Sequence, residues 1–107
     1  MLALFAFRPT PYYVNRSMNA RVHCVVTGLV QGVGYRYFIQ TKARALALRG
    51  SVSNRPNGDV EIVAEGSKEV LEQLISLART GPRSAMVTGI SIDWEEPTGK
   101  FSGFDVQ

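Results

Sequence analysis

The alternation of apolar and polar positions predicts five β-strands along this chain. In residues 21–27, for example, Val22, Cys24 and Val26 fall on one side, as expected for a half-buried strand. The five strands are expected at residues 21–27, 51–55, 59–64, 86–94 and 101–106.

Two further segments show the spacing of apolar positions that is typical of amphipathic helices. The first helix is predicted over residues 35–48, and we interpret Gly50 as its stop. The second is predicted to begin after Ser67, a good N-cap, and to end before Gly81-Pro82. The two apolar stripes comprise Tyr35, Phe38, Ile39, Ala43, Leu46 and Ala47 in the first helix, and Val70, Leu71, Leu74, Ile75 and Ala78 in the second.

The order of these elements predicts an α+β fold. Between the second and third strands, Asn57-Gly58 favours a tight hairpin because both residue types tolerate positive φ. The resulting order β-α-β-β-α-β, followed by a short C-terminal strand, is that of a ferredoxin-like split βαβ sandwich. Such a fold has a mostly antiparallel sheet with two helices on one face.

Composition adds few constraints. The 107 residues allow one domain with a single core, and no apolar run approaches the roughly 20 residues of a membrane span. The single cysteine, Cys24, excludes an intrachain disulfide and is interpreted as a small core residue. A cytoplasmic location fits this composition best.

The charge is unevenly distributed. Residues 1–19 contain Arg8 and Arg16 but no acid, whereas residues 20–107 hold 10 basic and 9 acidic side chains. The nearly neutral body gives little support to nucleic-acid binding. We interpret residues 1–19 as an N-terminal extension, for which a misassigned start is one explanation and an ordered accessory strand the alternative, and residues 20–107 as the domain.

Candidate chemistry lies where the first strand meets the first helix. Three glycines in residues 28–34 permit positive φ, so that successive N–H groups at the helix N-terminus can surround an anion. Arg36, in the first helical turn, is unfavourable beside the positive helix end unless an anion is bound there. Its planar guanidinium suits two phosphate oxygens. The alternative, a simple turn with a solvated arginine, is about equally compatible with these residues alone.

Asn54 and His23 are two further polar residues in predicted strands. Asn54 shares a side of its strand with Val52, so its amide needs a partner or could hold a water molecule. By itself, a turn-flanking asparagine that bonds the local backbone is the simpler interpretation. The only histidine, His23, is interpreted as structural, because it has no neighbouring residues with metal-ligand spacing.

Taken together, these residues resemble the acylphosphatase family. Residues 26–36, VTGLVQGVGYR, are similar to the family signature V-x-G-x-V-Q-G-V-x-[FY]-R. Residues 50–61, GSVSNRPNGDVE, resemble the second signature G-W-V-R-N-x-x-D-G-x-V-E, and residues 81–85, GPRSA, match G-P-x-x-A. The resemblance covers about residues 20–107. Ser51 and Ser53 replace the usual tryptophan and arginine, on the side of the strand opposite Asn54, where we expect changed surface packing.

The resemblance implies an enzyme that hydrolyses acyl phosphates to a carboxylate and inorganic phosphate. Arg36 would bind the phosphate, and Asn54 would orient the attacking water. The main-chain amides of the loop would complete the phosphate site; these belong to Gln31, Gly32, Val33, Gly34 and Tyr35. The family implies no metal and no cofactor, and we expect a monomer with no nucleic-acid or membrane partner.

Two alternatives use the same fold. An RNA-binding module would share the element order, but residues 59–64 lack the stacking aromatics of such modules and contain two acids. Acylphosphatase-like domains also stand at the front of larger hydrogenase-maturation proteins, whereas this sequence spans one domain.

Overall fold

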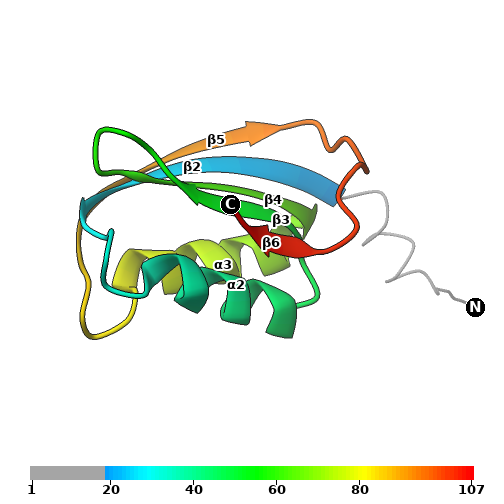
Figure 1. The fold of residues 1–107 in the computed structure, drawn as a ribbon. Coiled ribbons are helices and arrows are strands. Elements are labelled where there is room, and N and C mark those ends of the chain that lie inside the picture. The colour runs from blue at the N-terminus through cyan, green and yellow to red at the C-terminus, as the bar shows by residue number, and fades with distance from the viewer. Residues whose placement is uncertain (1–18) are drawn as a thin grey trace, which may run out of the picture.

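The computed structural model describes residues 19–107, which form the predicted order of strands and helices (Figure 1). The interpretation of residues 1–19 lies outside the described residues, except that Asn19 begins the first strand. The elements are β2 (Asn19–Leu29), α2 (Tyr35–Ala45), β3 (Arg49–Asn54), β4 (Val60–Ser67), α3 (Lys68–Thr80), β5 (Met86–Glu95) and β6 (Phe104–Val106).

The strands form one mixed sheet in the order β5-β2-β4-β3-β6. All neighbours are antiparallel except β3 and β6, which run parallel. Both helices cover the same face of this sheet, and we call the other face the open face (Figure 1). This arrangement confirms the predicted ferredoxin-like α+β fold.

The core lies between the sheet and the two helices. Along β2 the alternation places Val22, Cys24 and Val26 inside, opposite apolar residues of β4. Burial raises the pKa of the Cys24 thiol to about 11, so it stays protonated near neutral pH and packs as a small apolar group. Of the described helices, neither α2 nor α3 has the length and apolar character needed to cross a membrane.

The end of α2 differs from the prediction. The helix stops at Ala45, and the N–H groups of Ala47 and Leu48 donate to the carbonyls of Arg44 and Ala43 in a Schellman-type cap. Ala47 takes the left-handed conformation, with φ 58°, where glycine is usual. Interpreting Gly50 as the helix stop was therefore wrong.

Gly50 belongs to β3 instead. Its φ is 152°, and a Cβ at this position would lie 1.9 Å from the carbonyl oxygen of Val63. The glycine is needed because β3 and β4 approach closely here. A glycine just beyond a helical pattern is compatible with either role, so sequence alone misassigned it.

Other element ends agree more closely with expectation. The Ser67 hydroxyl accepts a hydrogen bond from the Val70 N–H, and α3 ends at Gly81 with φ 67°. In the turn between β3 and β4, residues 55–59, only Gly58 has positive φ, whereas Asn57 uses its side-chain oxygen to accept from the Asp59 N–H. The last strand, β6, is shorter than predicted and begins at Phe104.

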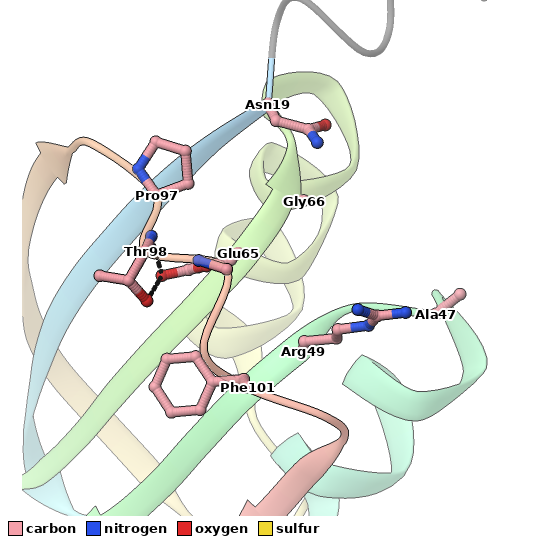
Figure 2. Close-up of a pocket in the computed structure, with 9 residues that line it drawn as sticks. Asn19, Ala47, Arg49, Glu65, Gly66, Pro97, Thr98 and Phe101 are labelled. Atoms are coloured by element: carbon pink, nitrogen blue, oxygen red, sulfur yellow. Dashed lines mark hydrogen bonds between the residues drawn. The ribbon is translucent and has the colours of Figure 1, made fainter.

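Residues 96–103 connect β5 to β6 and contact a buried carboxylate on the open face (Figure 2). Glu65, in β4, is only 8% exposed and accepts hydrogen bonds from the Thr98 and Gly99 N–H groups and from the Thr98 hydroxyl, each at 2.9 Å. The Arg21 guanidinium donates a further bond at 3.0 Å. Burial opposes ionisation of Glu65, but these four donors outweigh it and lower the pKa to about 2.

This low pKa predicts a contribution of Glu65 to acid stability. Because the unfolded chain takes up the proton first, the stabilisation is present above the unfolded pKa of 4.5 and is lost as the pH falls towards about 2. We expect Glu65→Gln to be about 3 kcal/mol less stable than wild type near neutral pH and nearly equal to it near pH 2. Urea unfolding across this range measures the difference. Glu72→Gln, at an exposed position of α3, serves as control, and parallel pH profiles for wild type and Glu65→Gln would contradict the assignment.

Candidate active site

The loop at residues 30–34 carries the chain from β2 into α2. Gly32 and Gly34 have φ of 73° and 81°, and Gly34 is the N-cap of the helix. A Cβ added to either glycine would meet no atom within 4 Å. The glycines are therefore needed for backbone conformation, and the space above the loop is open to a ligand.

This loop presents main-chain donors without partners. Within residues 19–107, no acceptor is found for the N–H groups of residues 32–37. The first turn of α2 contains no acidic side chain, so nothing offsets the positive end of the helix dipole. Such an arrangement of donors and helix dipole is suited to an anion.

The loop is held in place from two sides. The Gln31 side-chain nitrogen donates to the carbonyls of Arg55 and Asp59 in the β3–β4 hairpin, both at 2.8 Å. On the other side, the Ser84 hydroxyl donates to the Val33 carbonyl at 2.6 Å. Gln31 was predicted only as an amide donor, and its bracing role was missed because the two carbonyls belong to a distant turn. Its side chain faces the hairpin, which leaves only the main chain for a ligand.

The helix is also fixed by its first residue. Tyr35 is buried, and its hydroxyl donates to the Ala78 carbonyl of α3 at 2.7 Å. Burial raises the pKa of Tyr35, which keeps the hydroxyl protonated as a donor. A Cβ on Gly81 would come within 3.0 Å of the Tyr35 ring, so the glycine after α3 is also needed for packing. These contacts hold the start of α2 against α3.

Arg36 is the second residue of α2 and contacts the last residue of the sequence. Its Nη1 donates to the main-chain oxygen of Gln107 at 2.7 Å, and the Gln107 N–H donates to the Val52 carbonyl at 2.8 Å. A guanidinium has five N–H donors, so this bond orients the group and leaves the others for a ligand. Sequence patterns could not identify Gln107, because the contact spans 71 residues.

Asn54 is exposed at the end of β3, and none of the described residues hydrogen-bonds its side chain. The alternative interpretation, a turn-flanking asparagine, applies instead to Asn57, whose amide bonds the main chain and side chain of Asp59. The Asn54 amide is thus free to act on a ligand.

Asn54 and Arg36 line the same pocket, which has a volume of about 310 Å³. The structure therefore brings together the two predicted catalytic residues from separate elements. The predicted loop residues Gly32, Gly34 and Tyr35 also line it, whereas Gln31 and Val33 do not. Residues not predicted from sequence complete the wall: Val30, Tyr37, Gln40 and Val106. Gln40 lies one helical turn after Arg36, so its position on the same helix face could have been predicted from the sequence. No local sequence feature indicated that Val106 lines the pocket.

His23 lies outside this pocket. It sits in β2 and its Nε2 is hydrogen-bonded to Glu61 of the neighbouring strand, as a structural residue would be. In the part of the chain that the structure describes, no three His, Cys, Asp or Glu side chains gather closely enough to hold a metal ion.

Comparison with known proteins identifies the family. The family model described as Acylphosphatase matches residues 22–106. The chain belongs to the acylphosphatase family. An acylphosphatase from Thermus thermophilus is 48% identical over 86 residues, covering 80% of this chain and 97% of the relative. An acylphosphatase from Trichormus variabilis is 41% identical over 97 residues, covering 91% of this chain and 95% of the relative.

A solved acylphosphatase also shares the fold. The crystal structure of the Bacillus subtilis acylphosphatase matches with a TM-score of 0.79 at 35% identity, covering 82% of this chain and 98% of that one. The range matched by the family model, residues 22–106, includes the loop, α2 and the β3–β4 hairpin. The family assignment thus agrees with both the sequence signatures and the fold.

Proposed function

We propose that this protein hydrolyses the carboxyl-phosphate bond of acyl phosphates, with Arg36 and the loop amides binding the phosphate and Asn54 orienting the attacking water. The observation that carries the proposal is the single pocket lined by Arg36, Asn54 and the glycine loop. Membership of the acylphosphatase family supports the reaction type.

Phosphate binding follows from the donors at the pocket. The N–H groups of residues 32–37 have no acceptor among the described residues, and five of these residues line the pocket: Gly32, Gly34, Tyr35, Arg36 and Tyr37. Phosphoryl transfer spreads negative charge over the equatorial oxygens, so donors already fixed in position stabilise the transition state. Gln31 and Ser84 hold the loop, which keeps these donors in place before substrate arrives.

Asn54 supplies the complementary function at the same pocket. An amide offers a donor and an acceptor at once, so it can hold a water molecule with a defined orientation. Acyl phosphates expel a carboxylate, a good leaving group, and do not require strong general-acid assistance. Positioning of the water by Asn54 and charge stabilisation by Arg36 then suffice, without a covalent intermediate.

The proposed setting is a monomer in the cytoplasm. One chain brings Arg36, Asn54 and the glycine loop together in the proposed pocket. The single cysteine is buried and protonated, which suits a reducing compartment. An RNA-binding role is not favoured, because the central strand β4 carries Glu61 and Glu65 and no aromatic side chain.

The reaction can be tested with acetyl phosphate as substrate. We expect release of inorganic phosphate that is unaffected by EDTA, competitive inhibition by added phosphate, and far slower hydrolysis of an alkyl phosphate monoester, whose leaving group needs protonation. Loss of activity in EDTA with recovery on adding Mg²⁺ would contradict the proposed mechanism. The assay measures phosphate colorimetrically, with enzyme-free samples correcting for spontaneous hydrolysis.

A further inference from the structure

We propose that Glu65 is a positioning residue for Arg36, acting through the connection between β5 and β6. This inference rests on the proposed function, because it takes Arg36 as the phosphate-binding group. Glu65 belongs to the opposite end of the sheet and lines a separate pocket with Thr98 and Phe101 (Figure 2). Its hydrogen-bond partners among the described residues are Arg21, Thr98 and Gly99, none of which lines the proposed catalytic pocket.

The connection spans the full width of the sheet. β5 and β6 form opposite edges of the sheet, so residues 96–103 connect one edge to the other, and they pass over Glu65 on the open face near one end of the strands (Figure 2). Neighbouring strands lie about 4.8 Å apart, so the four steps from β5 to β6 give the sheet a width of roughly 19 Å. The nine Cα–Cα steps from Glu95 to Phe104 span at most about 32 Å when fully extended, so the connection can cross the sheet but cannot deviate far from it. A fixed point along it therefore influences where β6 begins.

Glu65 provides that fixed point at the middle of the crossing. It lies in β4, the central strand, and holds Thr98 and Gly99 through three hydrogen bonds of 2.9 Å. The Arg21 guanidinium adds to the anchorage, because it bonds Glu65 and lies 5.7 Å from the centre of the Phe101 ring. The carboxylate thus holds the connection against the open face.

From the connection, a continuous series of contacts leads to Arg36. The Gly103 carbonyl accepts from the Gly50 N–H at 2.8 Å just before β6 pairs with β3. At the other end of β6, the Gln107 N–H donates a hydrogen bond to the Val52 carbonyl, and the Gln107 main-chain oxygen accepts one from Arg36. β6 has only three residues, too few to fix its own register, so its position depends on its anchors. Phe104 is one anchor, because it is buried and its carbonyl accepts hydrogen bonds from Gln40 and Arg44 of α2, and Glu65 is a further anchor on the other side of the sheet.

A pair of matched substitutions tests this role. Glu65→Gln removes the charge that holds the connection. Glu61→Gln is the matched control. Glu61 lies on the same strand and the same face as Glu65, but its hydrogen-bond partner is His23 and not a residue of the connection. Both variants are assayed with acetyl phosphate at neutral pH, well below their unfolding temperatures. Two further measurements complete the test: inhibition of each variant by inorganic phosphate, and the hydrogen-exchange rate of the Gln107 amide.

We expect Glu65→Gln to lower kcat/KM and weaken phosphate inhibition on the order of 10- to 100-fold, as a small displacement of a binding group would. The Gln107 amide should exchange faster in Glu65→Gln, whereas Glu61→Gln should match wild type in all three measurements. If Glu65→Gln does not fold, Thr98→Val removes one bond to Glu65 and should shift the same measurements in the same direction.

Two results separate failure of this inference from failure of the proposed function. Glu65→Gln could melt at a lower temperature and still match Glu61→Gln in phosphate inhibition and in the hydrogen-exchange rate of the Gln107 amide. In that case Glu65 has only a structural role and the inference is overturned. If Arg36→Ala retains activity, the proposed function itself is wrong. An inactive Arg36→Ala together with impaired phosphate binding in Glu65→Gln supports both.

Discussion

Replacement of Arg36 by alanine is expected to lower kcat/KM for acetyl phosphate roughly 10³- to 10⁵-fold, the range in which an arginine that stabilises a transferring phosphoryl group contributes. The guanidinium is held by Gln107, and no other residue in 19–107 accepts a hydrogen bond from it. Its removal deletes the only cationic side chain among the pocket residues that the structure describes. Inhibition by inorganic phosphate should weaken in parallel, because ground-state phosphate uses the same donors.

Two further variants control this prediction. Arg36→Lys keeps the charge but loses the planar fork, so we expect it to recover only part of the lost activity. Arg79→Ala removes an exposed arginine from the last turn of α3 and should leave kinetics unchanged. The thermal midpoint of Arg36→Ala should stay close to wild type, since a cation at a helix N-terminus is itself unfavourable. Activity within tenfold of wild type in Arg36→Ala would exclude it as the phosphate-binding residue.

Replacement of Asn54 by alanine is expected to lower kcat roughly 10²- to 10³-fold while phosphate inhibition changes little. The amide lines the pocket and none of the described residues hydrogen-bonds its side chain, so its loss disturbs no other contact. A group that orients water contributes to the chemical step and not to phosphate binding. The separation of kcat from phosphate affinity therefore distinguishes Asn54 from Arg36.

Neighbouring substitutions sharpen the assignment of Asn54. Ser53→Ala changes the preceding residue, which lies on the open face opposite Glu61, and should leave kcat unchanged. Asn54→Asp keeps the shape of the side chain but places a negative charge near the phosphate, so it should also weaken phosphate inhibition. Equal losses of kcat and phosphate affinity in Asn54→Ala would contradict a water-orienting role.

The elements and most of the pocket were predictable because their causes are local. Apolar periodicity identified the strands and helices, and the glycine loop with Arg36 lies within one short segment of sequence. Asn54 followed from the second signature. The alternation of β3 also places Ser51 and Ser53 away from the helices, on the open face, as expected from their positions.

What escaped prediction depends on contacts between distant segments. The left-handed cap at Ala47 used a residue type that normally avoids that conformation, so Gly50 was mistaken for the stop. Val106 reaches the pocket, and Gln107 reaches the Arg36 side chain, only through the pairing of β6 with β3. A buried glutamate such as Glu65 cannot be distinguished in sequence from the exposed acids of the same sheet, because its donors come from a loop more than 30 residues away.

The pairing of the first and last long strands has a consequence for how the chain reaches this state. Arg21 of β2 lies opposite Glu95 of β5, so the sheet closes only when segments 74 residues apart meet. The entropy of that loop closure must be lost before the contacts form, which places such topologies among the slower two-state folders. The proposed phosphate pocket is lined by Val106 of β6 as well as by the loop, so its full lining is assembled only when β6 has paired with β3. Phosphate that binds this pocket would therefore bind the folded chain in preference to the unfolded one, and it would stabilise the fold by mass action.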